Sequence, residues 1–196
     1  MTADYTEREN VLKARVVERL SPDFYLRPEQ AGVDLVHGES LRPDFLLWPR
    51  LPLAAIGYPE QIVPVEVKYI SPDDIGALVK VCWQGITYQQ ARYPSELRGD
   101  MRPLFTMLYL DSEYPDIIAD EANRRSWNVL ARLLQRANVG FLDASSPGNV
   151  WRFMFANQPF CGRNNAGLFL SSVENLGLKI HVGNCETGRG ITTRYM

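Results

Sequence analysis

The stretch from Ile62 to Ile70 constrains the fold more than any other part of the chain. It is rich in β-branched residues, and its side chains alternate in character along the chain, a pattern that predicts a β-strand. Successive side chains of a strand point to opposite faces of the sheet, so Glu66 and Lys68 share one face and Val65 and Val67 share the other. Charges on a central strand are costly unless they serve a site, so this strand predicts a sheet core and a functional centre together.

Helices and further strands are predicted on both sides of that strand along the chain. Apolar side chains recur at helical spacing in residues 6–20, 74–92 and 120–137, which predicts three helices. Shorter apolar segments predict strands at residues 33–36, 45–48, 103–110, 139–142 and 150–155. This order predicts an α/β fold with a mixed central sheet flanked by helices. We expect residues 1–145 to form the core and residues 146–196 a β-rich C-terminal extension of the same domain.

Composition limits the classes of protein to which the chain can belong. Its 196 residues are the length of one ordinary domain. With 21 Lys and Arg against 23 Asp and Glu, the net charge is −2, which excludes an extended basic coat for nucleic acid. Phosphate binding must therefore be local, or must use metal ions held on carboxylates. Three scattered cysteines without a Cys-x-x-Cys pair argue against a zinc site, an iron–sulfur cluster and a disulfide scaffold.

The sequence also bears on location and on partners. The first residues are polar and acidic, unlike a signal peptide, and no apolar run approaches the roughly 20 residues that a membrane span needs. We therefore expect a reduced, cytoplasmic protein without a membrane partner. The Gly- and Asn-rich segment after Asn157 is a candidate contact for a second copy of the chain, as a homodimer, or for another protein partner.

A second acidic residue is a candidate companion for Glu66. Asp44 follows a proline and directly precedes the predicted strand 45–48. If that strand neighbours the strand carrying Glu66, the two carboxylates converge. Such a pair suits Mg²⁺, with Mn²⁺ as its expected substitute, because Mg²⁺ is often held by one or two carboxylates plus phosphates. Lys68 would then orient a water molecule or stabilise charge on an attacked phosphate.

Asp44 after a proline, followed by Glu66-Val67-Lys68, resembles the motif of the PD-(D/E)XK nuclease superfamily, which has the restriction-endonuclease-like fold. The predicted order of elements in the first 110 residues is similar to the core of that superfamily. The resemblance implies that Asp44 and Glu66 are metal ligands, that the Val67 carbonyl is a further ligand, and that Lys68 is the catalytic lysine. It implies an Mg²⁺-dependent deoxyribonuclease whose partner is DNA.

The resemblance implies two accessory positions as well. Many members carry an acidic residue on the first helix, which Glu9 matches, and Glu9 is then a further metal ligand. Glu9 has a second interpretation, because Thr6 and Glu9 have the spacing of a capping box. Some branches carry a glutamine and a tyrosine one turn apart on the helix after the lysine, which Gln84 and Tyr88 match; Gln84 would then act in the catalytic site.

The faces of the second predicted helix leave the role of Gln84 open. A helical wheel places the apolar side chains on one face, which comprises Ile75, Leu78, Val79, Cys82 and Ile86. Gln84 and Tyr88 lie opposite, together with Lys80. That second stripe either faces a substrate cleft or is simply solvated.

Candidate contacts with nucleic acid lie on the second and third predicted helices. Lys80 and Arg92 flank the second helix, Arg125 begins a basic stripe on the third, and Tyr88 could stack on a base. Each also has an ordinary interpretation as part of a solvated or packed surface. An alternative to the nuclease is a non-catalytic module that binds nucleic acid or a protein on the same fold. A third possibility is an assembly protein with an accidental match to the motif.

Overall fold

The computed structural model describes residues 3–51, 60–70, 74–94, 100–110, 121–143, 152–155, 158–159, 179–180 and 192–193. It is a mixed α/β structure, as the sequence predicts. Its helices are α1 (Ala3–Leu20), α3 (Ile75–Gln89) and α5 (Glu121–Arg136).

Within the described residues, the main sheet has the strand order β1-β4-β5-β7-β8-β9-β10. Its strands are β1 (Phe24–Pro28), β4 (Phe45–Pro49), β5 (Val63–Lys68), β7 (Thr106–Leu110), β8 (Val139–Asp143), β9 (Arg152–Phe155) and β10 (Gln158–Pro159). The sheet is mixed, because β5, β7 and β8 run parallel and the other neighbouring pairs run antiparallel. Two small sheets join β3 (Ser40–Leu41), β2 (Gly32–Asp34) and β6 (Ala91–Arg92), and β11 (Lys179–Ile180) with β12 (Thr192–Thr193).

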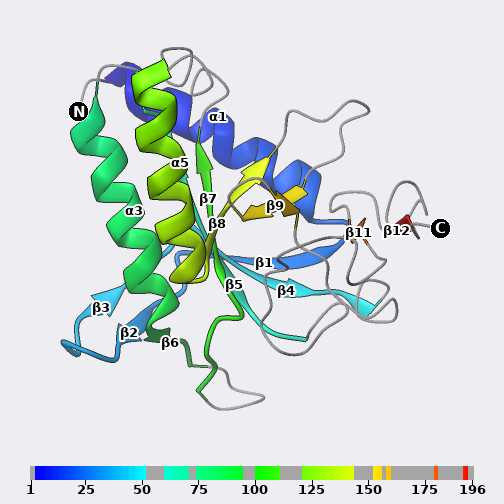
Figure 1. Cartoon of the computed structure of the whole chain (residues 1–196). Helices are drawn as coiled ribbons and strands as arrows, with labels where there is room; N and C mark the ends of the chain where they lie inside the picture. The colour runs from blue at the N-terminus through cyan, green and yellow to red at the C-terminus, as the bar shows by residue number, and fades with distance from the viewer. Residues whose placement is uncertain are drawn as a thin grey trace.

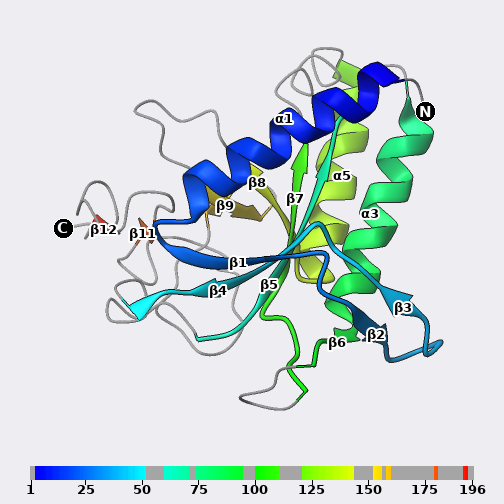
Figure 2. The same cartoon turned by 180° about the vertical axis from the view of Figure 1, so that it is seen from behind.

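Helices cover both faces of the main sheet. Figure 1 shows α3 and α5 side by side on one face, and Figure 2 shows α1 crossing the other. Beneath α1, Leu12 and Val16 pack in one cluster with Val65 and Val67. These valines are the apolar set predicted for the strand at Ile62–Ile70, so the alternation of that strand is confirmed.

The ends of two helices differ in how well the sequence predicts them. Asp74 is the N-cap of α3, at the start of the predicted helix, and its side chain accepts a hydrogen bond from the Ala77 backbone N–H at 2.8 Å. Helix α1 begins at Ala3, so Thr6 lies inside the helix. The capping-box interpretation of Thr6 and Glu9 is therefore wrong, and Glu9 is free to serve another purpose.

The buried face of α3 agrees with the helical wheel at Leu78, Cys82 and Ile86 and differs from it at Val79 and Tyr88. Val79 is 48% exposed, whereas Val81 and Tyr88 are buried. Gly85 explains the difference, because a Cβ there would lie 2.9 Å from the Val139 Cγ1 atom of β8. The missing side chain lets α3 approach the sheet at this position, which turns Tyr88 inward.

Strand β1 is the main element that the sequence analysis misses. It pairs antiparallel with β4 at the edge of the sheet. The predicted strand 33–36 is shorter, because Asp34 accepts hydrogen bonds from the backbone N–H groups of Val36 (3.1 Å) and His37 (2.9 Å) and so closes a turn. The predicted second helix also ends earlier, at Gln89, since Ala91 and Arg92 pair with β2.

The segment assigned to the C-terminal extension contributes to the core. Strand β9 pairs with β8, and the Phe153 ring packs 5.9 Å from the Phe24 ring and 5.4 Å from the Phe105 ring. Residues beyond β10 are described only as β11 and β12. No helix in the described residues combines the length and apolar character that crossing a bilayer requires.

Candidate functional site

Asp44 lies where β4 begins, directly beside β5. Its Oδ2 atom accepts a hydrogen bond from the Val67 backbone N–H at 2.7 Å. The antiparallel register pairs Phe45 with Val65, and one further step along that register brings Asp44 opposite Glu66. The structure therefore brings together the acidic residues that the sequence predicts to converge.

Glu66 is a buried carboxyl group in an unusual setting. Its side chain is only 4% exposed, and burial together with the nearby Asp44 charge raises its pKa to about 7. Lys68, a hydrogen bond from Tyr88 and the charge of Lys13 each oppose that rise. The Oε2 atom of Glu66 is buried without a hydrogen-bond partner. A buried acceptor without a donor is costly, so this oxygen is suited to bind a cation or a hydrogen-bond donor.

Lys68 is held by the acidic residue of the first helix. Its Nζ atom lies 2.9 Å from the Glu9 Oε1 atom, and Glu9 is 8% exposed. This ion pair fixes the ammonium group at the end of β5. Glu9 thus points at the predicted site, in keeping with the accessory position that the resemblance implies.

Lys13 is a member of this cluster that the sequence analysis misses. Its Nζ atom lies 2.5 Å from the Asp44 Oδ1 atom. Burial alone would lower the pKa of Lys13, but the Asp44 ion pair and the further charges of Glu9 and Glu66 outweigh it and raise the pKa. A signal was present, since Glu9 and Lys13 are four residues apart and so lie on one side of a helix.

Gln84 and Tyr88 both turn toward the sheet. The Tyr88 hydroxyl has one proton and two acceptors beside it, the Arg42 carbonyl oxygen at 3.2 Å and the Glu66 carboxylate. The Gln84 Oε1 atom is buried without a partner. Tyr88 is 4% exposed, so the expectation that it stacks on a base at the surface is corrected: it supports the Glu66 carboxyl group instead.

The donor types at the cluster fit a hard divalent cation. Asp44 and Glu66 offer carboxylate oxygens, and Glu66 Oε2 is an orphaned acceptor. The negative charges of Asp44, Glu9 and Glu66 favour a cation at the position of the Lys13 ammonium. As arranged, however, no set of three or more His, Cys, Asp or Glu side chains within the described part of the chain is grouped to hold a metal. A cation would therefore have to displace Lys13 and draw the carboxylates together.

The candidate contacts with nucleic acid lie on three other elements, α3, β6 and α5. Lys80 is exposed on α3, and Arg92 is exposed on β6, where its Nη1 atom lies 3.8 Å from the Asp100 Oδ2 atom. Arg125 lies on α5, but its side chain falls outside the described residues. The Val67 side chain is in the core, while its backbone N–H binds Asp44.

Burial raises the pKa of the Cys82 thiol to about 11, which argues against this cysteine as a nucleophile. Comparison of the chain with protein-family models, with curated proteins and with solved structures found no match.

Proposed function

We propose that this chain is an Mg²⁺-dependent deoxyribonuclease of restriction-endonuclease-like fold, which hydrolyses phosphodiester bonds in DNA. The observation that carries the proposal is the meeting of Asp44, Glu66 and Lys68 at one end of β4 and β5, with an orphaned carboxylate oxygen among them. Two acids and a lysine at the ends of adjacent strands are what metal-assisted phosphodiester hydrolysis requires.

The order of elements supports the proposed fold. Along the chain, α1 is followed by three antiparallel strands of the main sheet (β1, β4 and β5), then by α3, and then by β7 parallel to β5. This is the order that the motif resemblance implies for the core.

Each side chain of the cluster has a role in the proposed reaction. Asp44 and Glu66 would hold the cation, which when bound polarises the phosphodiester and lowers the pKa of a water molecule. Lys68 would donate to the attacking water or to the phosphate oxygens, and Glu9 holds its ammonium in place through their ion pair. Lys13 neutralises Asp44 when no other cation does.

Two further residues extend the proposal toward substrate. Gln84 has a buried oxygen without a partner and lies one turn before Tyr88, so it would orient the Glu66 carboxyl group or a phosphate. The exposed side chains of Lys80 and Arg92 would bind DNA phosphates, with Arg125 as a further candidate on α5.

A second function, in which the same fold binds nucleic acid or protein without cutting, is favoured by one observation. The Lys13–Asp44 and Lys68–Glu9 pairs neutralise much of the charge of the cluster without any metal. A cluster whose charges are already paired in this way also fits a site without catalytic activity. The two functions differ in whether a divalent cation can displace Lys13.

A cleavage assay tests the proposal. The protein is incubated with supercoiled and with linear DNA in Mg²⁺, in Mn²⁺ and in EDTA, beside the variant Asp44→Asn, which keeps the size of the side chain. Cutting that needs the cation and disappears in Asp44→Asn supports the nuclease. Binding without cutting supports the non-catalytic module. If the protein neither binds nor cuts DNA, both functions are contradicted.

A further inference from the structure

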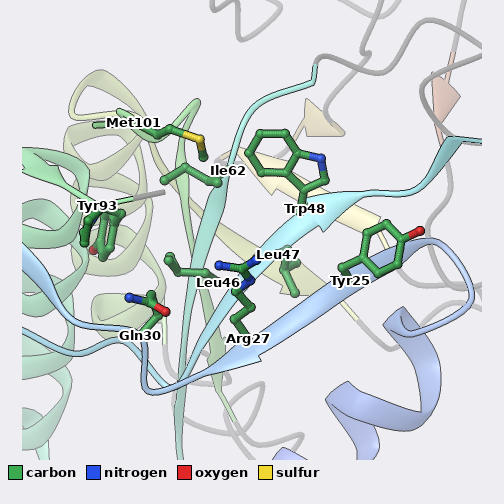
Figure 3. Close-up of a pocket in the computed structure, with 10 residues that line it drawn as sticks. Tyr25, Arg27, Gln30, Leu46, Leu47, Trp48, Ile62, Tyr93 and Met101 are labelled. Atoms are coloured by element: carbon green, nitrogen blue, oxygen red, sulfur yellow. The ribbon is translucent and has the colours of Figure 1, made fainter. Parts of the chain in front are cut away.

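A cavity of about 350 Å³ lies on β1 and β4, away from the carboxylate cluster. Figure 3 shows Trp48 on one side, Tyr93 and Met101 on the other, and Ile62 and Leu46 between them. Ligand pockets in proteins span about 300–1,000 Å³, so this cavity lies at the small end of that range.

The register of β1 against β4 builds one side of this cavity. Tyr25 pairs with Trp48, and Arg27 pairs with Leu46. Directly opposite residues of an antiparallel pair project from the same face of the sheet. The two strands therefore present two rings, a guanidinium and an apolar side chain side by side.

The chemistry of the lining favours a nucleobase. Trp48, which is half-buried, and Tyr25, which is half-exposed, both line the cavity, and the buried Tyr93 forms part of its wall. Arg27 and Gln30 supply hydrogen-bond donors, and the described lining contains no acidic side chain. A second cation is close, since the Arg50 guanidinium lies 4.3 Å from the Tyr25 ring centroid. Aromatic platforms with arginines beside them are the means by which proteins hold unpaired bases.

The cavity and the carboxylate cluster lie along the same strand, because Leu46 of β4 lines the cavity and Asp44 directly precedes β4. Leu46 follows Asp44 by two residues, so their Cα atoms lie about 7 Å apart on an extended strand, roughly the length of one stretched nucleotide. The Tyr93 hydroxyl donates to the Tyr88 carbonyl oxygen at 3.4 Å, and Tyr88 contacts Glu66. Tyr93 and Tyr88 therefore link the wall of the cavity to the Glu66 carboxyl group.

We propose that this cavity binds one unpaired nucleobase of the DNA strand whose phosphodiester lies at Asp44 and Glu66. This inference rests on the proposed nuclease function and makes it more specific. The substrate class becomes single-stranded DNA, or duplex DNA with a frayed or extended single-stranded end.

Binding without cleavage tests this inference. A 12-nucleotide single strand and a blunt 12-bp duplex are titrated in EDTA at one fixed salt concentration, because affinity for DNA depends on salt. Trp48→Leu removes the platform, and Trp83→Leu is the matched control, because Trp83 is 63% exposed on α3 and does not line the cavity. Arg27→Gln is a second test at an exposed position, chosen in case Trp48→Leu does not fold.

The expected result is a loss of single-strand affinity of about fivefold or more for Trp48→Leu, a smaller loss for Arg27→Gln, and no change for Trp83→Leu. Duplex affinity should stay the same in all three. Equal affinities in Trp48→Leu and Trp83→Leu, or no binding of single strand by the unaltered protein, would overturn the inference. If the cavity binds bases but no cation supports cutting, only the nuclease fails; if cutting occurs and all variants bind alike, only the cavity proposal fails.

Discussion

The two ends of strands β4 and β5 differ sharply in what they contribute. At one end, Asp44 and Glu66 lie close together with little solvent, which is electrostatically unfavourable. At the other, Leu47 and Val63 are fully buried in the apolar cluster beneath α1. The comparison indicates that the apolar end stabilises the sheet, whereas the charged end carries an electrostatic cost of the kind that occurs at functional sites.

The largest expected effect is on catalysis at the charged end. Lys68→Ala should lower the rate of DNA cleavage by on the order of a hundredfold or more, because the ammonium that faces the reacting phosphate is removed. Initial rates on linear DNA in Mg²⁺ measure the change. Arg15→Ala, an exposed change on α1, is the control and should cut normally. Unchanged cutting by Lys68→Ala would show that this end has no catalytic role.

The next largest effect is on stability at the apolar end. Leu47→Ala should lower the free energy of unfolding by about 2–5 kcal/mol, because it leaves a cavity in a closely packed cluster. Urea denaturation measures it, and Val79→Ala, at an exposed position, should change stability little. If Leu47→Ala were as mild as Val79→Ala, the contrast between the two ends would disappear.

At the charged end the expected stability effect has the opposite sign. The folded protein holds the Glu66 proton more tightly than the unfolded chain does, so stability falls as pH rises from about 4.5 to about 7. Glu66→Gln removes this loss and should raise the free energy of unfolding at pH 8 by up to about 3 kcal/mol, and by little at pH 4. Denaturation at both pH values measures the difference. If Glu66→Gln were less stable than the unaltered protein at pH 8, the expectation that the buried Glu66 carboxylate destabilises the fold would be wrong.

The smallest expected effect concerns the cation that Lys13 supplies. Lys13→Gln removes the ammonium from Asp44, so Mn²⁺ should bind roughly three- to tenfold more tightly. Calorimetry measures the affinity, with Arg15→Gln as the control on the same helix. Unchanged or weaker Mn²⁺ binding would mean that Lys13 does not occupy the place of a cation. The result would then favour the non-catalytic alternative.

Some of this arrangement could be predicted from the sequence because it depends on local periodicity. The alternation around Glu66 fixes which side chains share a face, and Asp74 caps α3 through contacts within one turn. The sequence places Lys13 on the same side of the helix as Glu9, but its ion pair with Asp44 depends on how close α1 lies to β4, which only the fold determines. Strand β1 has no clear alternation of its own and gains its pairing from β4.

The helical wheel misplaces Val79 and Tyr88 of α3 for a physical reason, although it places Leu78, Cys82 and Ile86 correctly. A wheel that counts apolar side chains gives glycine no weight, yet Gly85 is where α3 and β8 come closest. That close approach buries Tyr88 and exposes Val79. An inward polar side chain such as Tyr88 is stabilised by its contact with Glu66, which only the folded structure creates.

The contact between Phe24 and Phe153 has a consequence for how the protein matures in a cell. One ring comes from the first strand of the chain and the other from β9, so their pairing waits until most of the polypeptide has left the ribosome. Until then, Phe105 is without its contact to the Phe153 ring. A chain that ends before β9 would therefore leave this edge of the aromatic core uncovered by Phe153.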